Sequence, residues 1–247
     1  MYFQPGFQIG QQYMQGCGLA QQAMMLEVSG NWNPASAVQL YEQAATLIWG
    51  SMTQAQQWGL PVYAGAWFAL GTVHFNAARV QTAMGWSAPA SQHLAQALQC
   101  LNQAIAMQPG FVPFHSAAGT VLVAQGNLPE AQRAFETAVR LNPADVYSNY
   151  MLGVMHSVQG NGAAATQYYG VVQQQAPTLP PPQQFQPAPA PAPGGQRANS
   201  AANWLDIINK IATTVKNVGD AANSISGLFG HSQMFSQPAW PGQMPGF

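Results

Sequence analysis

Charged side chains are scarce in this chain. Asp, Glu, Lys and Arg make up 5% of the 247 residues, six basic against seven acidic, whereas an ordinary soluble protein carries roughly 25%. Without basic side chains to neutralise phosphates, nucleic acid is not expected as a partner. Glutamine, with 32 residues, takes the place of charge and hydrogen-bonds without repelling a second copy. A net charge near zero favours association; a compositional bias of the source is the alternative interpretation.

Cysteine is also rare, and long apolar runs are missing. The two cysteines, Cys17 and Cys100, form no metal-binding motif and no disulfide framework, and lone thiols suit a reducing compartment. The first ten residues have neither the basic stretch nor the apolar stretch of a secretory signal, and no run reaches ~18 apolar residues. The sequence therefore predicts a cytoplasmic protein without a membrane span.

Groups that could carry chemistry are scattered. The seven carboxylates are not paired for acid–base work, the five histidines lack metal-ligand spacing, and no phosphate-binding glycine loop is present. Cys17, in QGCGL, has no preceding strand and no neighbouring base. His74, His115 and His156 are expected to be packed, hydrogen-bonded histidines on helices. We therefore predict no enzyme activity, no catalytic residue, no cofactor and no metal.

The chain does contain a 34-residue repeat between residues 97 and 177. Small residues at fixed positions allow two antiparallel helices to approach, an aromatic residue fills the gap, and a proline ends the second helix. Gly126 suits the left-handed end of a first helix, and Asn127 with Glu130 predicts a capping box at the start of the second. The matching pairs are Gly119 and Gly153, Gly126 and Gly160, Asn127 and Asn161, Ala131 and Ala165, Phe135 and Tyr169, and Pro143 and Pro177.

The clearest copy, SAAGTVLVAQGNLPEAQRAFETAVRLNP, resembles the tetratricopeptide repeat (TPR) family of helix-turn-helix solenoids. The resemblance covers residues 62–177, with a further copy that starts at Trp67 in WFALGTVH and is 14 residues longer than the others. We expect an extended hairpin there, with Trp86 at its tip as a candidate contact or simply as a cap on the helices. The resemblance implies a concave face that receives a peptide or a helix.

Two more helices are predicted ahead of the repeats, at residues 8–30 and 34–58. Asn33 suits the N-cap and Pro34 the first helical position of the second one. Within it, ASAVQLYEQAA echoes the second helix of the repeats. Residues 1–60 are therefore predicted to form a degenerate repeat or an N-terminal cap, and residues 61–177 the TPR-like repeats.

The last part of the chain is predicted to be a tether, a helix and a flexible tail. Residues 178–199, rich in Pro, Ala and Gln, favour an extended spacer. Residues 180–198 would span about 60 Å when fully extended. Residues 200–230 form an amphipathic helix whose apolar positions alternate three and four apart, a heptad seam for another helix; residues 231–247 follow as the tail. The seam consists of Trp204, Ile208, Ile211, Val215, Val218, Ala222, Ile225 and Phe229.

An isolated helix of this kind is marginal in water, so we expect it to fold when docked. Its dock is a copy of itself, the groove of a solenoid, or a membrane surface; the last is disfavoured because interfacial helices usually carry a basic face. The sequence as a whole predicts an all-α chain: a short TPR-like solenoid of antiparallel helix pairs, a Pro-rich linker and a C-terminal helix. We interpret it as a non-enzymatic protein–protein interaction scaffold or adaptor, with a peripheral membrane protein as the alternative.

Overall fold

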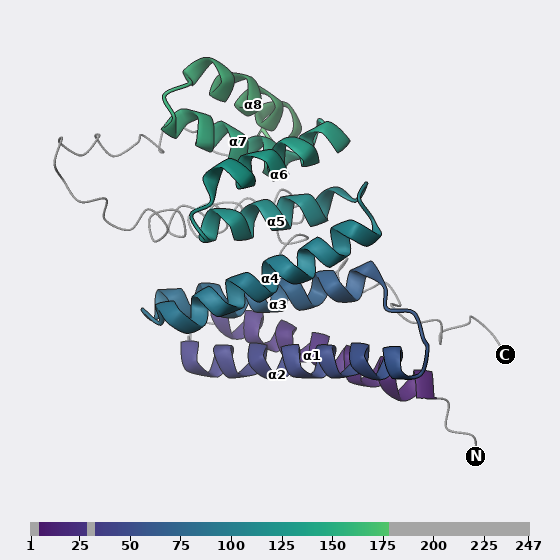
Figure 1. Cartoon of the computed structure of the whole chain (residues 1–247). Coiled ribbons are helices and arrows are strands. Elements are labelled where there is room, and N and C mark those ends of the chain that lie inside the picture. The colour runs from purple at the N-terminus through teal and green to yellow at the C-terminus, as the bar shows by residue number, and fades with distance from the viewer. Residues whose placement is uncertain (1–4, 29–32, 178–247) are drawn as a thin grey trace. The chain divides into compact units, whose positions relative to one another are not determined.

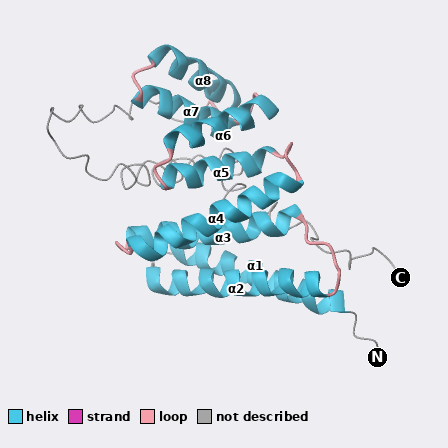
Figure 2. Cartoon of the chain, in the orientation of Figure 1, coloured by secondary structure: helices cyan, strands magenta, loops and turns pink. Residues whose placement is uncertain are grey.

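The computed structural model describes residues 5–28 and 33–177, and within these ranges it contains helices and turns but no strand (Figures 1 and 2). The all-α fold of antiparallel helix pairs is thus confirmed. The proline-rich linker and the predicted C-terminal helix lie outside the described residues. The helices are α1 (Pro5–Val28), α2 (Pro34–Gln57), α3 (Ala64–Ala83), α4 (Ser87–Met107), α5 (Val112–Ala124), α6 (Leu128–Leu141), α7 (Val146–Val158) and α8 (Gly162–Gln175).

The described residues form two compact units that divide between Pro109 and Gly110. The first unit contains the hairpins α1–α2 and α3–α4, and α2 packs against α3. The second contains the hairpins α5–α6 and α7–α8, and α6 packs against α7. Each unit therefore consists of two helical hairpins joined through the second helix of one and the first helix of the next.

The N-terminal hairpin follows the predicted capping. The Asn33 side chain accepts a hydrogen bond from the backbone N–H of Ser36 at 3.2 Å, and Pro34 is the first residue of α2. The predicted start of α1 at residue 8 was three residues late. The helix begins at Pro5, because proline is tolerated in the first turn, where its missing N–H has no intrahelical partner.

The turns of the 34-residue repeats are built on glycine. Gly126 and Gly160 have φ angles of 78° and 79°, the left-handed conformation expected after a first helix. At the next residue the two copies differ. The Asn161 side chain accepts from the N–H of Ala164 at 3.3 Å, whereas Asn127, at the N-cap, makes no such cap and donates to the carboxylate of Glu130 at 2.7 Å. The predicted capping box was therefore wrong, because the charged acceptor draws the amide group to itself.

The α3–α4 hairpin is extended, as its sequence spacing predicted. Its helices have 20 and 21 residues, seven more each than the 13 and 14 of α5 and α6. Seven residues are close to two full turns at 3.6 residues per turn. The insertion therefore leaves the residues before and after it on the same buried face of each helix. Accordingly a Cβ added at Gly71 would lie 3.0 Å from Leu101, the residue that corresponds to Phe135 in the next copy.

Candidate functional site

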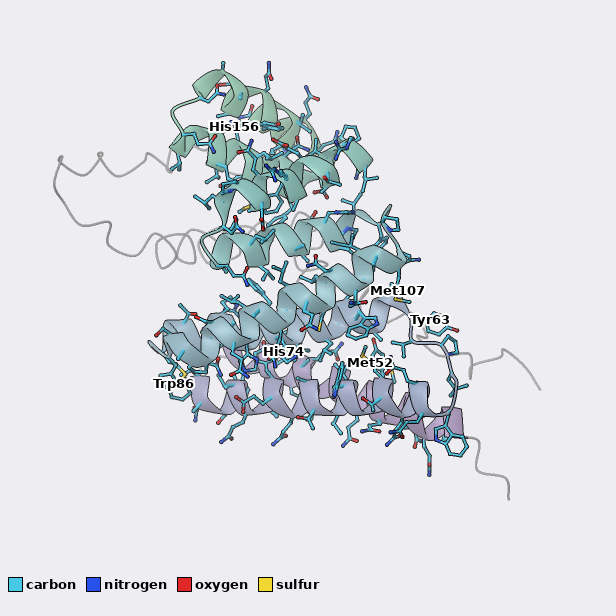
Figure 3. All side chains as sticks on the ribbon, viewed as in Figure 1. Met52, Tyr63, His74, Trp86, Met107 and His156 are labelled. Carbon is cyan, nitrogen blue, oxygen red and sulfur yellow. The ribbon has the colours of Figure 1, made fainter. Side chains whose placement is uncertain are left out.

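Trp86 is the predicted site residue that falls within the described ranges. It occupies the N-cap position of α4 and is 45% exposed. Figure 3 shows it at one end of the α3–α4 hairpin, with Tyr63 and Met107 at the other end. Its side chain makes no capping hydrogen bond. The residue lies at the tip of the extended hairpin, as the sequence spacing predicted. The predicted docking residues from Trp204 to Phe229 lie outside the described residues.

Large apolar side chains are exposed mainly on the first unit. Among the described residues, eight of the eleven belong to residues 5–109. This concentration makes the surface of the first unit the candidate interaction site. The eight are Phe7, Met14, Met25, Trp49, Trp58, Tyr63, Trp86 and Met107.

Two tryptophan rings, one on α2 and one on α3, contact each other edge to face. The ring centroids of Trp49 and Trp67 are 5.9 Å apart and the rings meet edge to face at 67°. Trp67 is half-buried against the core of the unit, while Trp49 remains 52% exposed. An exposed tryptophan held by a second ring is a rigid apolar contact of the kind enriched at the centres of interfaces. Sequence reasoning missed Trp49 because its exposure depends on which face of α2 packs against α1 and α3.

A partly buried ion pair joins the first three helices. Glu27 of α1 accepts hydrogen bonds from Arg79 of α3 and from the hydroxyl of Tyr41 on α2, the latter at 2.6 Å. Burial, together with the neighbouring carboxylate, raises the pKa of Tyr41. Because both partners hold it, Glu27 is a structural group that fixes the register of three helices.

A histidine pair joins α3 and α4. The Nδ1 atoms of His74 and His93 are 3.0 Å apart, so one neutral ring donates to the other. The carboxylate of Glu42 lies 3.9 Å from Nε2 of His93. Burial, reinforced by His93, lowers the pKa of His74 to about 4, and burial also lowers that of His93. No group of three or more metal-ligating side chains occurs in the described ranges.

The third histidine on a first helix is packed differently from the prediction. The ring of His156 stacks on Tyr168, with centroids 5.4 Å apart and an angle of 7°. Its Nδ1 atom is buried and has no hydrogen-bond partner. The expected hydrogen bond was therefore wrong for this residue, because stacking on α8 fixes the ring without one.

The cysteines are poor nucleophiles. Cys17 and Cys100 are both buried, and burial raises the pKa of each thiol to about 12. A reactive cysteine instead has a lowered pKa and an exposed thiol. This environment disfavours the nucleophile hypothesis for Cys17 in QGCGL.

In the second unit, hydroxyl groups join adjacent hairpins. The side chains of Ser116 and Ser148 are 2.8 Å apart, and those of Thr120 and Tyr147 are also 2.8 Å apart. These pairs connect α5 to α7 inside the unit. They satisfy buried polar groups and therefore belong to the packing of the repeats.

Comparisons with known proteins found one family model and several solved structures that resemble part of this chain. Residues 116–180 match the family model described as tetratricopeptide repeat. A crystal structure of MamA is 15% identical with a TM-score of 0.40, covering 62% of this chain and 93% of that one. The crystal structure of YrrB, a TPR protein with an unusual peptide-binding site, is 17% identical with a TM-score of 0.39, covering 65% and 86%.

Among curated proteins, none matches the chain. No helix in the described ranges is long and apolar enough to cross a membrane. Residues 116–180 are similar to the tetratricopeptide repeat family, in the part of the chain where the 34-residue repeat lies.

Proposed function

We propose that this protein is a non-enzymatic protein–protein interaction scaffold or adaptor. The observation that carries the proposal is the concentration of exposed aromatic and methionine side chains on the first unit. These residues are not needed to close the hairpins of that unit, whose gaps are filled by buried side chains such as Ile48 and Leu101. Aromatic residues and methionine are enriched at protein–protein interfaces relative to the rest of the surface.

The described polar groups support a non-enzymatic role. The carboxylate of Glu27 is held by Arg79 and Tyr41, and both cysteines are buried with a raised pKa. The histidine pair is partly buried, and its lowered pKa values keep it neutral at pH 7. These groups stabilise packing and lack the exposed, perturbed side chains in a cleft that catalysis uses.

The C-terminal segment supplies the docking element of the proposal. Residues 204–229 carry the heptad seam, and the linker before them reaches about 60 Å when extended. A protein dock is favoured over a membrane because the segment has only two basic residues, Lys210 and Lys216. The dock is either another copy of the segment or a groove of the repeats that accepts a peptide or a helix.

The test is a double substitution in the seam of the full chain. Ile211→Asp with Val215→Asp places two charges at apolar seam positions, so we expect it to abolish docking while the repeats remain folded. Thr213→Asp with Asn217→Asp, on the opposite face of the predicted helix, is the matched control. Mass by light scattering and binding to partner helices are compared for the three proteins.

A seam variant that behaves like wild type in both assays would contradict the docking role. Flotation with phosphatidylcholine and phosphatidylserine vesicles distinguishes the membrane alternative. If wild type floats and the seam variant does not, the segment is a membrane anchor instead of a protein dock.

A further inference from the structure

Helix α1 carries an apolar stripe on its outer face. Phe7, Met14 and Met25 are 60%, 52% and 53% exposed. At 100° per residue they lie within about 20° of one line along the helix, a stripe about 27 Å long. We call this row, together with Gln11, Gly18 and Gln21, the α1 stripe.

The stripe is uncharged. Glu27 is the charged residue of α1, and its carboxylate is engaged by Arg79 and Tyr41 with a side-chain exposure of 14%. The outer face therefore offers apolar and glutamine side chains alone. Such a face has no charge complementarity for an acidic or basic partner, and it does not repel an identical face.

The spacing of the stripe is symmetric, as an alternation of four and three residues along one helix face is. Its positions 7, 11, 14, 18, 21 and 25 pair about residue 16, so that two antiparallel copies place Phe7 at the height of Met25, Gln11 opposite Gln21, and Met14 opposite Gly18. Gly18 has open space around it, since a Cβ there would meet nothing within 4 Å. A methionine side chain from a second copy fits over this glycine, and sulfur–aromatic contact suits the Phe7 and Met25 pair.

We propose that the α1 stripe is an interface with a second copy of this chain, in which two α1 helices pack antiparallel about a two-fold axis level with residue 16. Each pair of contacting residues then occurs twice in the dimer, as an isologous interface requires. A contact about 27 Å long between helices about 10 Å wide covers a few hundred Å² on each copy. This is below the ~800 Å² of a standard interface, so the dimer is weak, with a dissociation constant of roughly 10–100 µM.

Sedimentation equilibrium of the full chain tests the interface. Wild type is expected to dimerise in this range, and Met14→Glu to weaken dimerisation by about 100-fold, because a charge replaces two buried methionines per dimer. Gln174→Glu, an exposed site on α8 in the other unit, is the control and should dimerise like wild type. A monomeric wild type at ~1 mM, or a Met14→Glu chain that dimerises equally well, overturns the proposal.

A mixing experiment tests the register. Gly18→Lys alone should be monomeric, because a long cationic side chain then covers the hollow that receives Met14. In an equimolar mixture with Met14→Glu, the new ammonium group at position 18 lies at the height of the new carboxylate at position 14, and a one-to-one dimer should return. If the mixture stays monomeric, the antiparallel register is wrong. Circular dichroism melting of each variant confirms that the helices remain folded.

This interface is separate from the proposed docking segment. The seam variant Ile211→Asp with Val215→Asp should leave the α1 dimer unchanged, whereas Met14→Glu should leave docking of the segment unchanged. A self-association that only the seam variant abolishes would refute the α1 interface and leave the proposed function intact.

Discussion

At the residue scale, the polar side chains of the first unit find partners that are distant in sequence. Arg79 meets Glu27 across 52 residues, and His74 meets His93 across 19. Each contact joins different helices, so it depends on how the hairpins pack against one another. In a chain with so few charges, these groups serve to position the helices.

The partly buried histidine pair predicts a loss of stability in acid. The pKa of His74 is about 4 in the folded protein and near 6.5 when unfolded, so between these values the unfolded chain binds more protons. Stability is therefore full above about pH 6.5 and falls as the pH drops towards 4, by about 3 kcal/mol from this group. His93, on α4, changes in the same direction, while Glu42 on α2 opposes the change.

Urea unfolding at pH 7 and pH 4.5 measures this loss. In His74→Leu the difference in unfolding free energy between the two pH values should shrink by roughly 2–3 kcal/mol. An unchanged difference would mean that other groups cause the acid sensitivity.

At the element scale, a glycine on one helix and a large side chain on the other close each hairpin of the second unit. A Cβ at Gly119 would lie 2.8 Å from the ring of Phe135, and one at Gly153 would lie 2.5 Å from the ring of Tyr169. These contacts recur at the 34-residue spacing, since each repeat places the same pair at the same height.

Two alanine substitutions of opposite sign test this packing. Gly153→Ala should destabilise the protein by about 1–3 kcal/mol, because the methyl group overlaps the ring of Tyr169. Gly170→Ala, inside α8 with nothing within 4 Å of its Cβ, should stabilise it by about 1 kcal/mol, the helix propensity difference. Chemical denaturation of both variants gives the two values, and equal signs would contradict the packing argument.

At the scale of the whole molecule, the scarcity of charge governs how copies of the protein associate with one another and with other proteins. With 5% charged residues, long-range repulsion between copies is small and apolar contact decides association. The exposed aromatic and methionine side chains of the first unit then act without an electrostatic barrier. The protein is suited to contacts that are insensitive to ionic strength.

Ionic strength provides the corresponding measurement. The dissociation constant of the wild-type dimer should change by less than about twofold between about 0.05 and 0.5 M sodium chloride, because no ion pair crosses the α1 stripe. Sedimentation equilibrium across this series measures it. A tenfold weakening in salt would indicate a charged interface elsewhere on the molecule.

Local sequence by itself determined the all-α class, the repeat length, the glycine turns and the extended α3–α4 hairpin, because each depends on residues close together in the chain. The heptad seam of residues 204–229 stays a prediction of that kind. Tertiary structure decided which side chains remain exposed, such as Trp49 and Met14, and which distant groups pair, such as Glu27 with Arg79. The physical reason is that a helix fixes its own periodicity, whereas burial depends on the neighbours that pack against it.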